Sequence, residues 1–175
     1  MRLFKISALL FAVLLVFASC GDDSSLKLSY QSSPKEAFED EVVQEAVTGG
    51  MSSIVQEIGT YALNDEYSVY FVVMEYNRNS GVRGSAPTVL LMKTKDGKYQ
   101  YTGISESFFT EVLSPDKDEE YSVASTKLKA GSKTYSFSFM RTEAYEKEAF
   151  TDCNIYEESM ELDGEEISVT VAISK

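Results

Sequence analysis

The chain has 175 residues, a formal net charge of −12 at pH 7, and no histidine or tryptophan. An acidic balance of this size is repelled by phosphate backbones, so we predict no nucleic-acid partner. Without histidine, the chain lacks zinc sites of the usual histidine type and the Ser-His-Asp and Cys-His arrangements of nucleophilic catalysis.

The first residues have the pattern of a secretory leader. Arg2 and Lys5 supply positive charge, and Ile6–Ala18 is an apolar run of 13 residues that only Ser7 interrupts. A charged start, a short apolar core and small residues before a cut are typical of a signal peptide. A membrane-spanning helix needs about 20 apolar residues, so this run is short for one. We therefore expect residues 1–19 to be removed as a signal peptide.

The end of the leader carries a second motif. Phe17, Ala18, Ser19 and Cys20 follow one another, and the sequence resembles the lipobox of bacterial lipoproteins, with Phe17 where leucine is common. The resemblance implies a diacylglyceryl group on the Cys20 thiol, cleavage between Ser19 and Cys20, and acylation of the new amine by a palmitate-type chain. Two or three such chains anchor a protein firmly. The lipobox resemblance further implies a Gram-negative envelope protein held in the outer membrane through Cys20, either periplasmic or exposed on the cell surface.

Other interpretations of this start remain open. One alternative is an ordinary secreted protein whose first mature cysteine is incidental. The other is a protein with an uncleaved N-terminal anchor. Gly21-Asp22-Asp23 resembles the surface-export signal of lipoproteins in one Gram-negative lineage, and it is equally typical of a solvated spacer. We expect residues 20–33 to be the lipidated cysteine and its tether, and residues 34–175 to form a single domain.

Charge and cysteine usage constrain the mature chain. The leader holds two of the 16 basic residues and none of the 28 acidic ones, so the mature chain has 14 basic and 28 acidic side chains, a charge of −14. This balance argues against electrostatic docking on anionic lipid, so the predicted membrane link is covalent. If Cys20 is a thioether, Cys153 has no disulfide partner, and we expect it to be a small buried hydrophobe.

Helical signals come next along the chain. Ser33 can cap a helix, Pro34 suits its first position and Glu36 completes a capping box. The apolar residues that then fall on one helical face are Phe38, Val42, Ala46 and Val47. Thr48–Gly50 interrupts this pattern, and helical spacing resumes over Met51–Leu63. We expect either two short helices that meet at the glycines or one kinked helix.

A strand and a polar loop follow. Tyr67–Tyr76 is β-branched and aromatic almost throughout, which predicts a central strand covered on both faces. Asn77–Pro87 is the longest polar, glycine-bearing stretch, and such loops are often functional. The residues of the candidate binding loop are Asn77, Arg78, Asn79 and Arg83. The alternative is a plain strand connection.

The rest of the chain predicts hairpins. The expected strand pairs are Thr88–Thr94 with Lys98–Ile104, Tyr121–Lys129 with Ser132–Met140, and Asn154–Leu162 with Glu165–Ser174. Asp-Gly and Ala-Gly dipeptides supply the turns. In the first pair, we expect Met92 opposite Tyr101 and Thr94 opposite Tyr99. Ser105–Leu113 suits either a short helix or a buried strand.

Side-chain alternation assigns the faces of the later strands. In the second pair, we expect the large residues Tyr135, Phe137 and Phe139 to lie opposite the small residues Thr126, Ala124 and Ser122, respectively. In the third pair, the residues expected on the buried face are Ile167, Val169, Val171 and Ile173. Arg141–Phe150 is expected to be a connection with one or two helical turns.

Together these elements predict an α+β fold in which an N-terminal helix or helix pair packs on one curled antiparallel sheet of six to seven strands. We expect no enzymatic activity, no metal site and no cofactor. The predicted function is non-catalytic binding or scaffolding of an unidentified protein or glycan, with the Asn77–Pro87 loop and neighbouring hairpin tips as the partner face. The alternatives are a small-ligand carrier or small enzyme with a cavity between helix and sheet, and an inhibitor or immunity-type protein.

Overall fold

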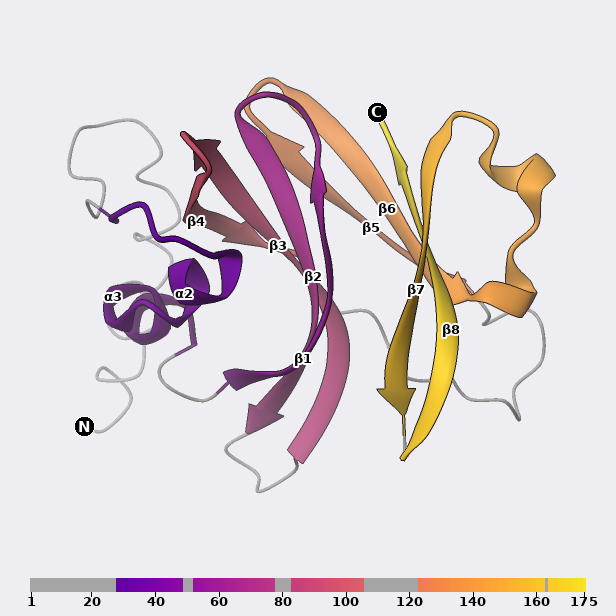
Figure 1. Ribbon diagram of the computed structural model, residues 1–175, viewed down its shortest axis with the longest axis horizontal. Coiled ribbons are helices and arrows are strands. Elements are labelled where there is room, and N and C mark those ends of the chain that lie inside the picture. The colour runs from indigo at the N-terminus through magenta and orange to yellow at the C-terminus, as the bar shows by residue number, and fades with distance from the viewer. Residues whose placement is uncertain (1–27, 49–51, 78–82, 106–122, 163) are drawn as a thin grey trace, which may run out of the picture.

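The computed structural model describes residues 28–48, 52–77, 83–105, 123–162 and 164–175. These residues form two four-stranded antiparallel sheets, shown in Figure 1. Sheet A has the strand order β1-β2-β3-β4, with β1 Ser52–Ala62, β2 Tyr67–Asn77, β3 Arg83–Lys95 and β4 Lys98–Ile104. Sheet B has the order β5-β6-β8-β7, with β5 Val123–Ala130, β6 Lys133–Arg141, β7 Cys153–Leu162 and β8 Glu165–Ser174.

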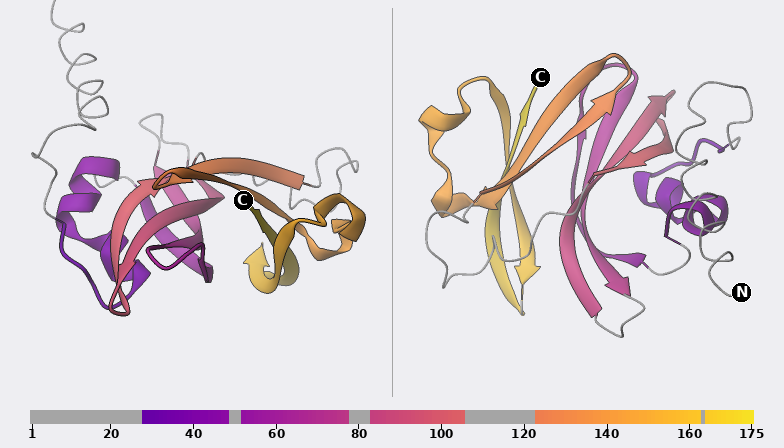
Figure 2. Two further views of the ribbon diagram at one scale, coloured as in Figure 1. Left: turned by 90° about the horizontal axis from the view of Figure 1, so that it is seen from above. Right: turned by 180° about the vertical axis from the view of Figure 1, so that it is seen from behind.

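Short helices accompany the sheets. Before β1 lie α2 (Pro34–Glu39), α3 (Glu41–Val43) and a π-helical turn, Gln44–Thr48. Between β6 and β7 lie two 3₁₀ turns, Thr142–Ala144 and Lys147–Phe150. Figure 2 shows α2 and α3 on the side of sheet A that faces away from sheet B, and the 3₁₀ turns at the far side of sheet B.

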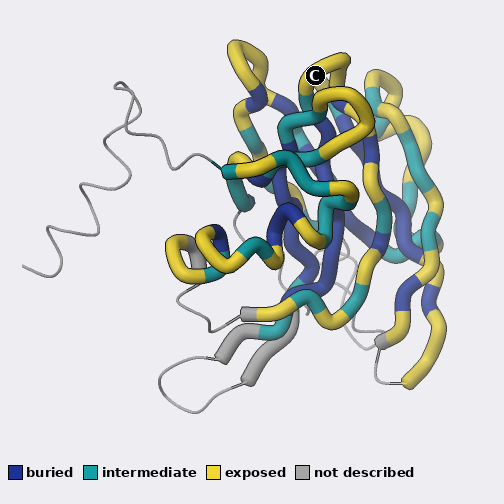
Figure 3. The backbone as a smooth tube through the Cα atoms, turned by 60° about the vertical axis from the view of Figure 1, so that its left-hand side comes forward, coloured by how far each residue is buried: buried dark blue, intermediate teal, exposed yellow. Residues whose placement is uncertain are grey.

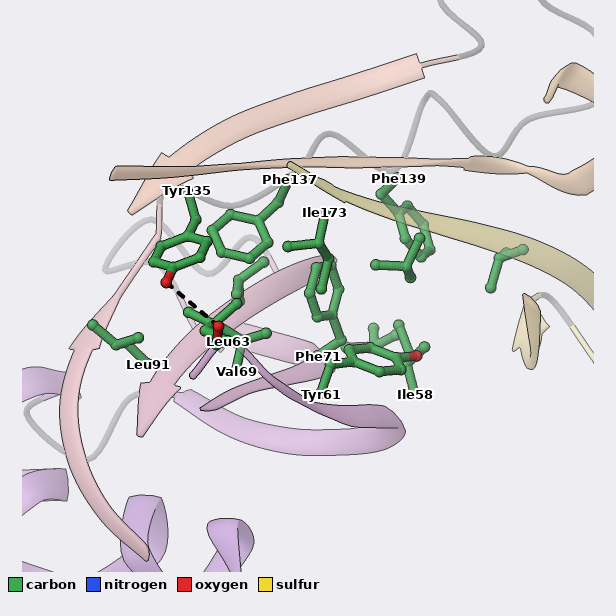
Figure 4. Packing of buried hydrophobic residues seen from close by; sticks show 14 of the residues in the cluster. Ile58, Tyr61, Leu63, Val69, Phe71, Leu91, Tyr135, Phe137, Phe139 and Ile173 are labelled. Carbon is green, nitrogen blue, oxygen red and sulfur yellow. Dashed lines mark hydrogen bonds between the residues drawn. The ribbon is translucent and has the colours of Figure 1, made fainter. Parts of the chain in front are cut away.

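The two sheets pack face to face through an apolar layer that we call the inner core. Its buried members from sheet A are Ile58, Tyr61, Leu63, Val69, Phe71, Val73, Val89 and Leu91, and those from sheet B are Ala130, Tyr135, Phe137, Phe139, Met160, Ile167, Val169, Val171 and Ile173. Figure 4 shows side chains of the two sheets pointing toward one another in this layer. The Phe71 and Phe137 rings meet edge-on, with centroids 5.9 Å apart.

A second apolar layer, the outer core, covers the opposite face of sheet A. Its buried members are Ala37, Phe38, Val43, Tyr70, Val72, Met74, Leu90, Met92 and Tyr101. Phe38 of α2 is fully buried, and its ring centroid lies 5.7 Å from that of Tyr101. Ser33 caps α2 by accepting a hydrogen bond from the Glu36 amide at 3.1 Å. The predicted helix start at Ser33 and Pro34 is therefore confirmed.

The predicted α+β architecture is wrong. The chain is mostly β, with two four-stranded sheets in place of one sheet of six to seven strands, and its helices are a few short turns. The physical reason is that β2 and β3 bury both faces, so sheet A needs a second sheet on one side and a cover on the other. A series of antiparallel hairpins is compatible with two sheets as well as with one.

The helix predicted over Met51–Leu63 is also wrong, because Ser52–Ala62 is strand β1. Its pairing with β2 slips between Ile54 and Gln56 and again between Glu57 and Gly59, as β-bulges do. Each bulge adds one residue and changes the phase of the alternation. Ile54 therefore packs against the outer core, while Ile58 and Tyr61 lie in the inner core. Apolar spacings of four and three residues result, which imitate a helix.

The pairing predicted for the first and third hairpins is confirmed, and the pairing predicted for the second is wrong. Met92 pairs with Tyr101 and Thr94 with Tyr99, as predicted, around a turn in which Asp96 and Gly97 both have positive φ. In the second hairpin the large residues pair two positions away from the prediction, with Tyr135 opposite Leu128, Phe137 opposite Thr126 and Phe139 opposite Ala124. Ala130 pairs with Lys133, so the turn residues are Gly131 and Ser132 rather than Ala130 and Gly131. The third hairpin and its buried face are confirmed.

Other predictions have mixed outcomes. β2 is the predicted central strand, buried on both faces between β1 and β3. The connection after β6 contains the two expected helical turns. The ambiguous stretch Ser105–Leu113 lies, apart from Ser105, outside the described residues. Figure 3 shows the middle of the strands as buried and the turns at their ends as exposed.

Candidate functional site

The residues predicted to carry the lipid anchor, Ser19 and Cys20, lie outside the described part of the chain. The described part begins at Leu28, whose carbonyl accepts a hydrogen bond from the Gln100 side chain. Gln31 then pairs with Tyr99 through two backbone hydrogen bonds, of 2.8 and 2.9 Å. The end of the predicted tether is thus fixed to the edge of β4 before α2 begins.

The candidate binding loop is shorter than predicted. β2 continues to Asn77, β3 begins at Arg83, and these two residues form the last pair of the ladder. Arg78 and Asn79 lie outside the described residues. Pro87 was predicted to lie in the loop, but it lies within β3 opposite Val73. Proline is tolerated at this position because β4 pairs with β3 only from Leu90 onward. The proline nitrogen, which has no proton to donate, therefore leaves no hydrogen bond to β4 unmade.

The space between the helices and sheet A is occupied by side chains. Phe38 and Val43 lie against Met74, Leu90 and the other residues of the outer core, whose exposed fractions are between 0% and 8%. A small-ligand carrier of the predicted kind would need a cavity at this place. The described side chains there form a packed apolar layer.

A tyrosine–carboxylate pair links the edges of the two sheets. Tyr61 of β1 donates a hydrogen bond from Oη to Glu158 Oε1 of β7 at 2.9 Å, and its ring centroid lies 4.1 Å from that of Tyr156. Gly59 makes the approach possible, since a Cβ there would lie 2.3 Å from Tyr61 Oη. Burial, and then the hydrogen bond and charge of Glu158, raise the pKa of the Tyr61 phenol.

A second tyrosine lies close to a carboxylate on the outer face of sheet A. Tyr70 is 2% exposed, and its hydroxyl lies near the Glu57 carboxylate without a fully formed hydrogen bond to any described residue. Burial, followed by the weak hydrogen bonding and charge of Glu57 and then by the charge of Glu39, raises the pKa of Tyr70. Glu57 also lies 3.6 Å from Lys35 Nζ. The pKa of Tyr101, in the same layer, is raised by burial.

These shifts limit what the tyrosines can do chemically. A phenol whose pKa is raised stays protonated at neutral pH, so Tyr61 and Tyr70 can donate hydrogen bonds but cannot act as general bases there. Cys153 is half-buried and free, less buried than the sequence suggests. Among the described residues, no group of three or more potential metal-ligating side chains comes together.

The cluster of Tyr61, Gly59 and Glu158 was not predicted from the sequence. Glu158 lies on the face of β7 that also carries Tyr156 and Met160. Its position between two large apolar residues in the sequence was a signal that this carboxylate is partly buried and has a partner. The partner across the sandwich could not be found while β1 was assigned as a helix.

A scan against protein-family models found no match, and searches of curated proteins and of solved structures found none either. In the portion of the chain that the structure describes, no helix is both long and apolar enough to span a bilayer.

Proposed function

We propose that this protein is a lipid-anchored envelope protein of a Gram-negative bacterium, held in the outer membrane through acylated Cys20, whose β domain has a non-catalytic binding or scaffolding role. The observation that carries the proposal is the order of a charged start, a short apolar core, and small residues followed by Cys20. Neither charge nor a spanning segment is needed to hold such a protein, since two or three acyl chains suffice.

The packing of the domain supports a binding or scaffolding role over that of a carrier. Side chains occupy both apolar layers, and of the tyrosines with raised pKa values Tyr61 is bonded to Glu158, Tyr70 lies near Glu57, and Tyr101 is packed in the outer core. What remains for a partner is the surface formed by turns and strand edges. Rigid sheets that present turns are a common arrangement for recognition, because the scaffold positions the loops.

The anchor is tested by feeding cells a clickable fatty acid and isolating the full-length protein. The wild-type chain is expected to take up the label, fractionate with membranes and show an acylated N-terminal residue in its mass spectrum. Cys20→Ser is expected to lose the label and leave the membrane fraction. Cys153→Ser, which removes the other cysteine, serves as the matched control and should retain both properties.

Two outcomes would contradict the proposal. One is a Cys20→Ser chain that still fractionates with membranes at full yield. The other is an unmodified mature N-terminus at a different residue, which would indicate ordinary secretion.

A further inference from the structure

Three turns meet at one end of the sandwich, which we call the hairpin end: the β1–β2 turn (Leu63–Glu66), the β3–β4 turn (Lys95–Lys98) and the β5–β6 turn (Ala130–Lys133). The Thr94 amide donates a hydrogen bond to the Glu66 carbonyl at 2.7 Å, and Asn64 Nδ2 donates one to Tyr135 Oη at 3.0 Å. Figures 1 and 2 show the β1–β2 and β5–β6 turns side by side at this end.

The hairpin end concentrates positive charge in an acidic protein. The lysines on its turns and adjoining strand ends are Lys93, Lys95, Lys98, Lys127, Lys129 and Lys133, and all but the half-buried Lys93 are exposed. The acidic residues on the same segments are Asp65, Glu66 and Asp96. None of these lysines forms an ion pair with a described residue, so their charges face solvent. The turns alone balance three lysines against three carboxylates, and the strand-end lysines Lys93, Lys127 and Lys129 give the hairpin end a net charge of +3.

The opposite end of sheet B has the reverse charge. The β7–β8 hairpin, Cys153–Ser174, has no lysine or arginine, and its described acidic residues are Glu157, Glu158, Glu161, Glu165 and Glu166. Ser174, near the hairpin end, lies nine positions after Glu165, which is about 30 Å at the rise of a strand. The Debye length at physiological salt is about 8 Å. A surface that touches the hairpin end is therefore screened from the carboxylates at the tip of the β7–β8 hairpin.

The tether leaves the domain close to the same end. Gln31 pairs with Tyr99, the residue directly after Lys98, and Leu28 lies beside Gln100. Seven residues, 21–27, separate Leu28 from Cys20, and an extended chain of that length spans about 25 Å. The hairpin end lies only two or three residues along β4 from this exit, so it is within reach of a bilayer that holds Cys20.

We propose that the hairpin end is a docking surface for anionic phospholipid headgroups of the bilayer that holds the anchor. Four lysines at or directly beside its turns, Lys95, Lys98, Lys129 and Lys133, which we call the turn lysines, contact the headgroups, and the acidic β7–β8 hairpin points away from the membrane. The inference rests on the proposed function for the anchor. It refines the expectation that net charge forbids contact with anionic lipid, because the distribution of charge, rather than its sum, decides the field at a surface.

Lysine footprinting of the anchored protein tests this orientation. The mature lipoprotein is reconstituted into vesicles of phosphatidylcholine, with or without phosphatidylglycerol, and its lysines are acetylated and quantified by mass spectrometry. We expect the four turn lysines to react at least about threefold more slowly with phosphatidylglycerol present, and the protection to disappear near 1 M salt, where the Debye length is about 3 Å. Lys147, exposed on the far side of sheet B, is the internal control and should not change. Equal reactivity of the turn lysines in both vesicles would overturn the proposal.

A second measurement does not need the anchor. A chain that begins at Gly21 retains all the described residues, and it is floated with the same vesicles once circular dichroism shows that it is folded. Each lysine close to an anionic surface strengthens binding roughly fivefold. The K95Q/K98Q/K129Q/K133Q variant should therefore bind phosphatidylglycerol vesicles at least about tenfold more weakly than the parent, while Lys147→Gln should match the parent.

The two measurements separate the two proposals. A full-length chain that lacks acyl groups contradicts the proposed anchor, and flotation of the Gly21 chain then decides the docking surface alone. Flotation that is equal for the parent and the quadruple variant contradicts the docking surface and leaves the anchor unaffected. Circular dichroism of the quadruple variant confirms that it is folded, since all four lysines are exposed.

Discussion

The inner and outer cores use the two faces of the same strands in different ways. The inner core joins two sheets whose strands are distant in sequence, as in the contact of Phe71 with Phe137. The outer core joins sheet A to helices of six and three residues and to the segment around Leu28. The inner core therefore holds the whole domain together, whereas the outer core is a local cover that one segment supplies.

The difference is visible in the sequence of the strands. β2 and β3 face both cores and have nearly continuous apolar runs, Val69–Met74 and Val89–Met92. β6 and β8 face the inner core on one side, and the runs Tyr135–Phe139 and Ile167–Val171 alternate large apolar with small or polar residues. The small residues Thr170 and Ala172 on the other face of β8 are nevertheless buried, and Thr170 bonds Thr142 of the first 3₁₀ turn. A continuous apolar run thus marks a strand between two apolar layers, and alternation marks a strand with one apolar face.

The largest expected effect comes from removing an aromatic ring of the inner core. Phe71→Ala deletes a fully buried ring that contacts both Tyr61 and Phe137. We expect the free energy of unfolding to fall by about 3–5 kcal/mol, the usual cost of Phe→Ala in a core. Urea denaturation followed by circular dichroism measures the loss, and native-state hydrogen exchange should show faster exchange in both sheets.

Phe38→Ala is the matched change in the outer core, since Phe38 is also fully buried. Its loss should accelerate hydrogen exchange in α2 and β4 while the amides of β6 and β8 keep the protection of the wild-type protein. If both variants loosened sheet B equally, the distinction between a global core and a local cover would be wrong.

The next effect concerns the close approach of β1 to β7. Gly59→Ala places a methyl group where Tyr61 Oη now lies, so the tyrosine must move and lose its bond to Glu158. We expect a loss of about 1–3 kcal/mol, as for overpacked cores. Thermal unfolding measures it. Gly103→Ala is the control because its Cβ would meet only Leu91 Cβ at 3.9 Å, and a loss of similar size there would rule out the steric explanation.

Alkaline pH should weaken both cores through their tyrosines. The pKa values of Tyr61, Tyr70 and Tyr101 are raised above the usual 10.0 by burial, so the unfolded chain loses these protons first. Their contribution to stability is complete below pH 10 and declines above it, by at most about 1.4 kcal/mol per pH unit for each tyrosine. Urea denaturation between pH 9 and 11 gives the slope, which Tyr61→Phe should reduce. An unchanged slope in that variant would assign the decline to other groups.

Two Tyr→Phe changes at pH 7 should differ in sign. Tyr61→Phe removes a hydrogen bond of 2.9 Å to Glu158 and should cost about 1 kcal/mol. Tyr70→Phe removes a buried hydroxyl that forms no full hydrogen bond with any described residue, so it should be neutral or stabilising. The midpoints of urea denaturation compare them directly, and a clear loss for Tyr70→Phe would mean that its hydroxyl is satisfied in solution.

The smallest effect is expected at the start of α2. Ser33→Ala removes the side-chain acceptor of the Glu36 amide and should cost about 0.5–1 kcal/mol, the low end for N-caps, because the helix has only six residues. The change should be confined to faster exchange of the α2 amides. Ser33→Asn, which can also cap, is the control and should restore protection.

Much of the fold was predictable where local chemistry decides the structure. The Asp96-Gly97 turn requires positive φ, which glycine and aspartate tolerate, and it fixed the register of β3 with β4. The alternation in β8 gave its buried face correctly. In contrast, the Gly131 turn lacks a residue such as Asn or Asp beside the glycine, and its register was misplaced by two.

The errors arose where the information is not local. The two bulges in β1 imitate helical spacing, and only pairing with β2 distinguishes the two structures. Likewise, one sheet or two cannot be decided from hairpins alone, since both use the same turns. The predicted loop Asn77–Pro87 was too long, because Pro87 normally ends a strand and is accommodated within β3 here by the short β4.

The pairing of Gln31 with Tyr99 has a mechanical consequence for a chain held by Cys20. A pulling force on the anchor acts on the two backbone hydrogen bonds of this pair before it reaches the ladders of the two sheets. The segment 28–48 would yield first, and its 21 residues reach about 70 Å when extended, at roughly 3.4 Å each. In a chain anchored through Cys20, the N-terminal cover would therefore detach before the sandwich unfolds.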